Sequence, residues 1–189
     1  MALDATGLDS RHASRPYACR NKSKRFSPRR FTLLAVASHT QSHLIAAAEV
    51  AVGPTNESPF FDDLVGEAGP HALGDRLRAD AAYDAEAHHE AARFFGIRSA
   101  VIPLNRRGTG RKWPQTRYRR QMVRRFRKRP RGSRHRRVYG QHWQAESVFS
   151  RNKRLLGPAL RAHSPASRER ECLLRVLTHN LMLLAAKGN

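Results

Sequence analysis

The first half of the chain contains apolar segments of two kinds, which predict strands alternating with helices. Two apolar runs, "RRFTLLAVAS" at 29–38 and "SHLIAAAEVAV" at 42–52, are separated by a short polar turn at His39–Gln41. Such runs, joined by so short a turn, are typical of a β-hairpin. The opening segment, "MALDATGL", is shorter and predicts a further strand that carries Asp4.

Helical spacing follows the hairpin. Apolar residues recur three and four positions apart over 60–68, and Gly69-Pro70 stops the pattern, so we expect a helix there. Further along we expect a short strand leading into Asp80, a helix over 84–95 and a strand over 97–104. Strands that alternate with helices in this way indicate an α/β fold.

The end of the chain is predicted to be helical. The pattern indicates a helix from Val138 until Gly157-Pro158 stops it. Ser164 and Pro165 then form a start signal, with the serine as the cap and the proline in the first turn. The apolar face of this last helix predicts core packing by five leucines: Leu173, Leu174, Leu177, Leu181 and Leu184.

Composition adds a large positive charge to this picture. The chain has 189 residues, enough for one domain (1–189) with a substantial core, and its formal net charge is +21 at pH 7. Because such a charge repels itself, a polyanionic partner is expected, nucleic acid first and an acidic membrane surface second. A merely soluble basic surface is the remaining alternative.

The charge is concentrated in a basic tract, residues 105–137, which holds sixteen Lys or Arg and no Asp or Glu. Aromatic residues such as Trp113 and Tyr118 lie among the arginines, and this mixture favours stacking on nucleic acid. We expect a short basic helix over about 116–128 against DNA, with a disordered solvated arm as the alternative. The candidate DNA contacts in the tract are Arg111, Lys112, Arg119, Arg120, Arg124 and Arg125.

Cysteine usage and hydropathy bear on the compartment. Cys19 and Cys172 are too few and too far apart to suggest a zinc site or a disulfide framework, which agrees with a reducing cytosol. The N-terminus lacks a signal-peptide pattern. The longest apolar stretch, "CLLRVLTHNLMLLAA", is interrupted by Arg175 and His179 and is too short for a membrane span. We therefore expect a soluble cytoplasmic protein.

Glu146 is the first acid after Glu90 and lies in a strongly basic neighbourhood. Residues three, four and seven positions apart share one face of a helix. The stripe that includes the glutamate consists of Tyr139, His142, Glu146, Ser150 and Lys153. A carboxylate among such groups would repel DNA phosphates, but it becomes useful if it holds a divalent cation that bridges to a phosphate. An ordinary exposed glutamate is the alternative.

The spacing of this stripe resembles a family signature. Tyr139-x2-His142-x3-Glu146-x6-Lys153 is similar to the Tyr-x2-Arg-x3-Glu-x6-Lys signature of insertion-sequence transposases with a DDE catalytic triad. His142 stands where that subgroup has Arg.

Three upstream segments extend the resemblance over essentially the whole chain. "LDATG" (3–7) and "RADAAYDAE" (78–86) resemble the segments that bear the first and second catalytic aspartates, with Ala82 in place of the usual Gly. "AVGPTNESPFFDDLV" (51–65) resembles the segment after the hairpin, although Asn56-Glu57 stands where the family has Asn/His-Asp.

The resemblance implies a ribonuclease H-like mixed sheet flanked by helices, with a basic insertion before the glutamate helix. It implies that Asp4, Asp80 and Glu146 are catalytic and hold two Mg²⁺ ions, for which Mn²⁺ could substitute. The reaction would be cleavage and strand transfer of double-stranded DNA at transposon ends and target. A homodimer in the transposition complex and a bacterial, nucleoid-associated location would follow.

The resemblance also assigns phosphate contacts to Tyr139, His142 and Lys153. His is cationic only when protonated and lacks the fork of Arg, so we expect a weaker phosphate grip at neutral pH. Family members carry an N-terminal region that recognises transposon ends, and the chain begins three residues before Asp4. We therefore expect a catalytic portion without that region, with non-specific, salt-sensitive DNA binding.

Two alternatives stay open at this stage. The first is a transposase remnant that binds DNA without catalysis, and the metal dependence of the triad separates it from an active enzyme. The second is a basic ribosomal or architectural protein, which would leave the spacing of the three acids unexplained.

Other acids and histidines are given structural roles. Asp84 is expected to cap the helix that follows it, with support of a metal ligand as the alternative. Asp9 is expected to lie in a loop, with assistance to Asp4 as the alternative. Exposed positions on helices are expected for Asp62, Asp63, His88 and His89.

Overall fold

In the computed structural model, the structure is described for residues 1–10, 31–53, 55–69, 76–105, 114–127, 139–140 and 142–187. Among these residues, no helix is both long enough and apolar enough to cross a membrane.

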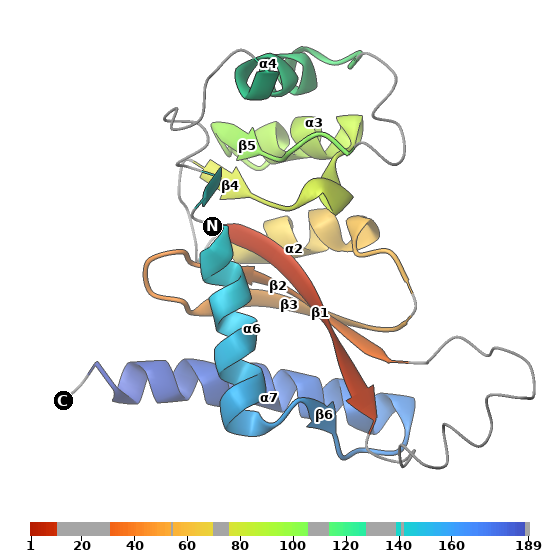
Figure 1. Cartoon of the computed structure of the whole chain (residues 1–189), viewed down its shortest axis with the longest axis vertical. Coiled ribbons are helices and arrows are strands. Elements are labelled where there is room, and N and C mark those ends of the chain that lie inside the picture. The colour runs from red at the N-terminus through yellow and green to blue at the C-terminus, as the bar shows by residue number, and fades with distance from the viewer. Residues whose placement is uncertain are drawn as a thin grey trace, which may run out of the picture.

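The strands form one mixed sheet with the first strand of the chain at its centre (Figure 1). The spatial order β3-β2-β1-β4-β5 is built from β1 (Ala2–Ser10), β2 (Thr32–Ser38), β3 (Ile45–Val52), β4 (Arg76–Arg78) and β5 (Ser99–Val101). β2 is antiparallel to β1 and β3, which confirms the predicted hairpin, whereas β4 is parallel to β1 and β5. A short sixth strand, β6 (Ala159–Leu160), pairs with the far end of β1.

Helices lie close to the predicted positions. They are α2 (Phe61–Ala68), α3 (Glu86–Phe94), α4 (Arg117–Arg127), α6 (Trp143–Leu156) and α7 (Pro165–Ala185), with short 3₁₀ turns η2 (Ser58–Phe60) and η3 (Ala81–Tyr83). α4 confirms the basic helix within the tract. α6 ends as expected at Gly157, whose φ of 91° lies in the left-handed region that glycine adopts without strain.

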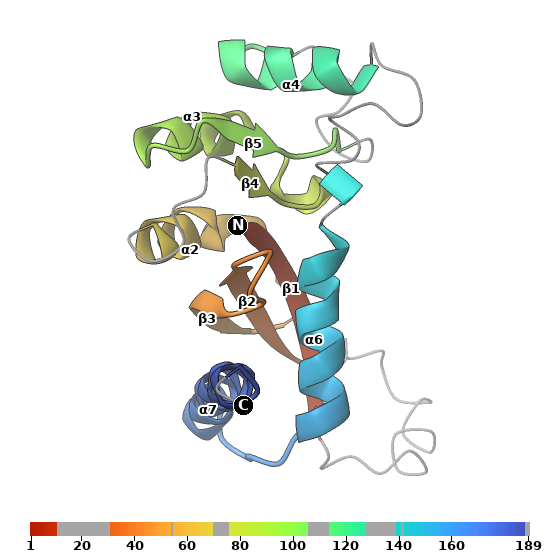
Figure 2. The ribbon, with the colours of Figure 1, turned by 90° about the vertical axis from the view of Figure 1, so that its left-hand side faces the viewer.

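Successive side chains of β1 point to opposite faces of the sheet, so the core has one part on each face. Leu3 packs with α2 residues such as Phe61 in one cluster, whereas Leu8 packs with α6 residues such as Val148 in the other. Figure 2 shows α2 and α6 on opposite sides of β1. Side chains two residues apart share a face, so Asp4 lies on the α6 side with its partner residue Val36.

The start of α7 follows the predicted signal, since Ser164 and Ser167 form a capping box and Pro165 occupies the first turn. The predicted burial of its leucines is wrong. Five leucines are 44–61 % exposed: Leu173, Leu174, Leu177, Leu181 and Leu184.

The inner face of α7 is instead partly polar. Arg175 and His179 are buried there beside Cys172 and Leu183. The guanidinium of Arg175 donates to the backbone oxygens of Gly157 and Ala159, and a ring nitrogen of His179 bonds the His43 carbonyl oxygen. These hydrogen bonds remove the cost of burying both polar side chains, so they can occupy positions that an apolar pattern would give to leucine.

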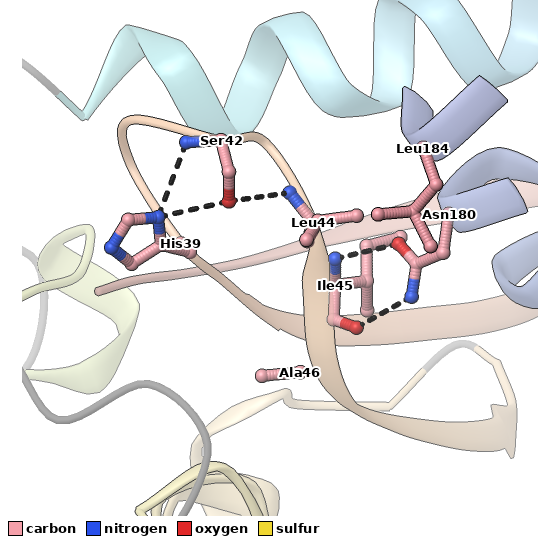
Figure 3. A pocket seen from close by; sticks show the side chains of 7 residues that line it. All are labelled: His39, Ser42, Leu44, Ile45, Ala46, Asn180 and Leu184. Atoms are coloured by element: carbon pink, nitrogen blue, oxygen red, sulfur yellow. Dashed lines mark hydrogen bonds between the residues drawn. The ribbon is translucent and has the colours of Figure 1, made fainter. Parts of the chain in front are cut away.

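Asn180 of α7 fastens the helix to the start of β3. Its Oδ1 accepts from the Ile45 N–H at 2.9 Å, and its Nδ2 donates to the Ile45 carbonyl oxygen at 2.8 Å (Figure 3). A cleft of about 490 Å³ lies beside this contact, between the β2–β3 turn at Leu44 and the last turns of α7 at Leu184. The side-chain amide thus imitates a strand partner at the end of β3.

Replacing Asn180 with Ala should lower the free energy of unfolding by about 1–3 kcal/mol, because both backbone groups of Ile45 lose their partner. Urea unfolding followed by far-UV circular dichroism measures the change. Leu181→Ala, at the neighbouring exposed position, is the control and should change stability by no more than about 0.5 kcal/mol. Equal effects of the two substitutions would contradict the role given to Asn180.

Candidate active site

Parallel pairing of β1 with β4 brings the first two predicted carboxylates together. Ala2 of β1 pairs with Arg78 of β4. Continuing this register by two residues places Asp4 beside Asp80, at the point where β4 gives way to η3. Backbone hydrogen bonds orient both carboxylates, since Asp80 Oδ1 accepts from Ala82 N at 2.7 Å and Asp4 Oδ1 accepts from Ala5 N at 2.9 Å.

The third predicted carboxylate comes from α6. Val148 and Phe149 bury the inner face of this helix against Leu8 and its neighbours, and Glu146 lies exposed in the first turn. Further along the helix, Lys153 Nζ donates to Thr6 Oγ1 at 2.6 Å, which ties α6 to β1 two residues beyond Asp4.

The charges of Asp80 and Glu146 both act on the carboxyl group of Asp4. Burial raises the pKa of Asp4 to about 6, and the negative charges of Asp80 and Glu146 add to the increase. The hydrogen bond from Ala5 N and the charge of Lys153 act in the opposite direction. A cation placed among these groups would therefore be attracted by all three.

Tyr139 and His142 lie just before α6, which begins at Trp143 with His142 as its N-cap and not at Val138 as predicted. Their rings stack with centroids 5.7 Å apart, and His142 is only 6 % exposed. Burial lowers the pKa of His142, although the charges of Asp80 and Glu146 partly counteract this effect. The imidazole therefore favours its neutral form, which carries no positive charge with which to hold a phosphate.

Two residues near the site were given no role from the sequence. Glu57, between β3 and η2, shares a side-chain hydrogen bond with Asp80. The Tyr83 hydroxyl is buried and, among the described residues, has no hydrogen-bond partner. The unusual Asn56-Glu57 pair was the one available signal for Glu57. Tyr83 falls on the tyrosine of the family's Asp-x-Gly-Tyr-Asp segment, but that match assigned no role to its hydroxyl.

The chemistry of the donor set suits a hard divalent cation such as Mg²⁺, because carboxylate oxygens are its preferred protein ligands. Two buried polar atoms near the carboxylates, Tyr83 Oη and His142 Nδ1, have no partner within the described residues, as expected of a site that holds further oxygen ligands. Among the described residues, however, no three His, Cys, Asp or Glu side chains form a cluster tight enough to bind a cation as they stand.

The basic tract divides into different environments. Arg120, Arg124 and Arg125 are exposed on α4 and remain candidate DNA contacts. Arg111 and Lys112 lie outside the described residues.

Arg119 has a different environment, since it is 3 % exposed and its guanidinium bonds Asp84 and Glu86 at 2.8–2.9 Å. Its donors are therefore occupied within the protein, and we do not keep Arg119 among the proposed DNA contacts.

The structure contradicts three sequence-based predictions for residues near the Arg119–Asp84 ion pair. Asp84 does not cap α3; its carboxylate instead binds Arg119 and the Asn105 N–H. Burial alone would raise the pKa of Asp84, but the hydrogen bonds from Arg119 and Asn105, with the His89 imidazole nearby, outweigh burial and hold that pKa far below its usual range. His88 and His89 are buried rather than exposed.

The buried histidines pack into this part of the core. The ring of His88 stacks on that of Phe61 with centroids 4.3 Å apart, and its Nδ1 forms a hydrogen bond with the Tyr83 carbonyl oxygen. His89 Nε2 lies 3.8 Å from Asp84 Oδ1. Asp9, expected in a loop, lies in β1 opposite Ala159. Asp62 and Asp63 are exposed on α2, as predicted.

The raised pKa of Asp4 predicts a pH dependence of stability in the metal-free protein. Between the unfolded value of 3.8 and about 6, the folded state holds a proton that the unfolded state has lost. The free energy of unfolding should therefore fall over this window as pH rises, by about 2 kcal/mol after allowance for solvent screening. Asp4→Asn should flatten the fall in urea titrations at pH 4 to 7, and a mutant profile parallel to wild type would contradict this assignment.

Removing the buried guanidinium of Arg119 should destabilise the fold. Removing an exposed guanidinium should have no comparable effect. Arg119→Met leaves Asp84 buried without its cation and should cost about 3 kcal/mol in urea unfolding. Arg124→Met is the matched control, for which we expect a change within about 0.5 kcal/mol and weaker DNA binding. Similar stability losses in the two variants would refute the structural role of Arg119.

Comparison with known proteins agrees with this geometry. The model of one family, described as the transposase DDE domain, matches residues 1–181. No curated protein and no solved structure matches the chain. The family match covers nearly the whole chain and contains Asp4, Asp80 and Glu146 in strand, strand-end and helix contexts. The chain therefore belongs to the family of proteins with a transposase DDE domain.

Proposed function

We propose that this chain cleaves and joins DNA phosphodiesters in a metal-dependent transposition reaction, with Asp4, Asp80 and Glu146 as its catalytic carboxylates. The observation that carries the proposal is the pairing of β1 with β4, whose register sets Asp4 beside Asp80, together with the packing of α6, which carries Glu146, against β1. Burial and the charges of Asp80 and Glu146 raise the pKa of Asp4, in agreement with this arrangement. Family membership supports a transposition-related activity.

The fold supports the same proposal. A mixed sheet with β1 at its centre and helices on both faces is the arrangement expected of a ribonuclease H-like domain. The first strand, the end of β4 and a helix packed on β1 each supply one carboxylate. Three ligands on three separate elements can be adjusted independently, so a small movement of α6 would close the set around a cation.

Asp4, Asp80 and Glu146 would hold Mg²⁺, or Mn²⁺ in its place. Two such ions would activate the attacking water or 3′-hydroxyl and stabilise the leaving oxygen. The residues of the chain supply binding and orientation: Lys153 is fixed near Asp4 through Thr6, and its ammonium could attract a phosphate beside the carboxylates.

The exposed arginines of α4 extend the DNA contact away from the carboxylates. Figure 1 shows α4 as the outermost layer beyond α3, at the opposite end of the molecule from α7. Arg120, Arg124 and Arg125 are exposed there, so DNA lying across the site could reach them. Because arginines of this kind contact phosphates, they would supply affinity without reading sequence.

A second function is favoured by one observation. Glu146 is exposed, and the described carboxylates form no cluster tight enough to hold a cation as they stand. A DNA-binding remnant without catalysis would have the same basic surface and the same family match.

Nicking of supercoiled DNA in the presence of Mg²⁺ or Mn²⁺ separates these functions. We expect Glu146→Gln to reduce nicking to the metal-free background while DNA binding is retained, because the amide removes a metal ligand and leaves the arginines in place. Glu169→Gln, at an exposed position of α7, is the matched control and should nick like wild type.

The other outcomes are equally clear. Wild-type protein that binds DNA but does not nick it with either metal would identify the remnant. Nicking that survives in Glu146→Gln would remove Glu146 from the catalytic set.

A further inference from the structure

Glu57 adds a fourth carboxyl group to the site. It occupies the N-cap position of η2, where the chain leaves β3 for α2, without a capping hydrogen bond from its side chain, and it is partly buried. Its side chain shares a hydrogen bond with that of Asp80, and both Asp80 and Asp4 act on it electrostatically. Four separate segments therefore bring carboxyl groups to the same end of β1, although the triad accounts for three.

Tyr83 provides an independent indication of a ligand near Glu57. The side chain is 0 % exposed, packed beside Phe61 and His88, and its hydroxyl has no hydrogen-bond partner among the described residues. Besides burial, the carboxyls of Glu57, Asp4 and Asp80 all raise the pKa of this phenol, so the hydroxyl lies within their field. A buried hydroxyl is a donor that requires an oxygen acceptor.

We infer that Glu57 is a fourth acidic ligand, which holds a divalent cation together with Asp80, and that the Tyr83 hydroxyl donates a hydrogen bond to an oxygen of that ligand set. This inference rests on the proposed function, since it adds residues to the same metal site. Two carboxyl groups already within hydrogen-bonding reach are well placed to share a hard cation.

The position of Glu57 explains why a further ligand is useful here. Glu146 is exposed and belongs to a helix that packs on the sheet from one side, whereas Glu57 precedes the helix that packs on the other side. Ligation by Glu57 and Asp80 would anchor the cation to the body of the domain. Glu146 could then join or leave as α6 moves. Tyr83, three residues after Asp80, would fix the orientation of the bound oxygens.

A purely structural role for Glu57 is the competing explanation. In that case its bond to Asp80 would only hold η2 against the end of β4. A glutamine could keep a hydrogen bond to Asp80 but would remove the charge that a cation needs. The substitution Glu57→Gln therefore separates ligation from loop anchoring.

Mn²⁺ binding to the full chain tests the inference without relying on activity. Free Mn²⁺ is measured by electron paramagnetic resonance, and the rise in Tm with added Mn²⁺ is measured in parallel. We expect Glu57→Gln to weaken Mn²⁺ binding by about tenfold or more and to reduce the Mn²⁺-dependent rise in Tm. Tyr83→Phe, which keeps the ring, should weaken binding by a smaller factor. Glu67→Gln, at an exposed position of α2, is the control and should bind like wild type.

Asp80→Asn distinguishes failure of this inference from failure of the proposed function. If Asp80→Asn loses Mn²⁺ binding while Glu57→Gln and Tyr83→Phe keep wild-type affinity, the fourth ligand is overturned and the triad stands. If wild-type protein binds no Mn²⁺, or Asp80→Asn binds it normally, both are overturned. Should Glu57→Gln not fold, Glu57→Asp and Tyr83→Phe carry the test, with intermediate affinity expected for the shorter carboxylate.

Discussion

Parallel pairing between the start of β1 and β4 is the contact on which the site depends. It joins Ala2 to Arg78, residues far apart in the sequence, and thereby sets Asp4 beside Asp80. The pairing is reinforced at its end, because the N-terminal ammonium of Met1 donates to the Arg76 carbonyl oxygen and the Met1 carbonyl oxygen accepts from the Arg78 N–H. Without this ladder, the two aspartates would belong to separate parts of the sheet.

Gathering carboxylates at one end of β1 costs electrostatic free energy, and the fold does not offset this cost with ion pairs to each of them. Burial and neighbouring negative charges raise the pKa of Asp4 to about 6 and that of Glu57 to about 7. Asp84 is treated differently, because Arg119 neutralises it and holds its pKa low. The contrast between Asp4 and Glu57, whose pKa values are raised, and Asp84, whose pKa is held low by Arg119, separates groups suited to bind a cation from one that stabilises the fold.

Local signals predicted much of the architecture. The hairpin, α2, the basic helix α4 and the capped start of α7 each depend on residues within a few positions of one another, and each is present. The exposed leucines of α7, the buried pair His88 and His89, and the buried Arg119 were missed. Their environments depend on partners such as Asp84 and the His43 carbonyl, which no local pattern reveals. For the site, family spacing predicted the triad, but the contact of Glu57 with Asp80 arises only when the loop after β3 folds back.

The segment from Asp80 to Glu86 connects the carboxylate site to the basic surface. Asp80 begins η3, Tyr83 ends it in the core, and Asp84 with Glu86 binds Arg119 on α4. The exposed arginines of α4 are therefore held by the same short turn that positions Asp80. A force applied to α4 by bound DNA would be transmitted to this turn through buried ion pairs, which resist displacement because separating them would leave Asp84 uncompensated in the interior. Under the proposed function, phosphate binding at α4 and cation binding at Asp80 would thus act on the same turn, although the residues involved are forty or more positions apart.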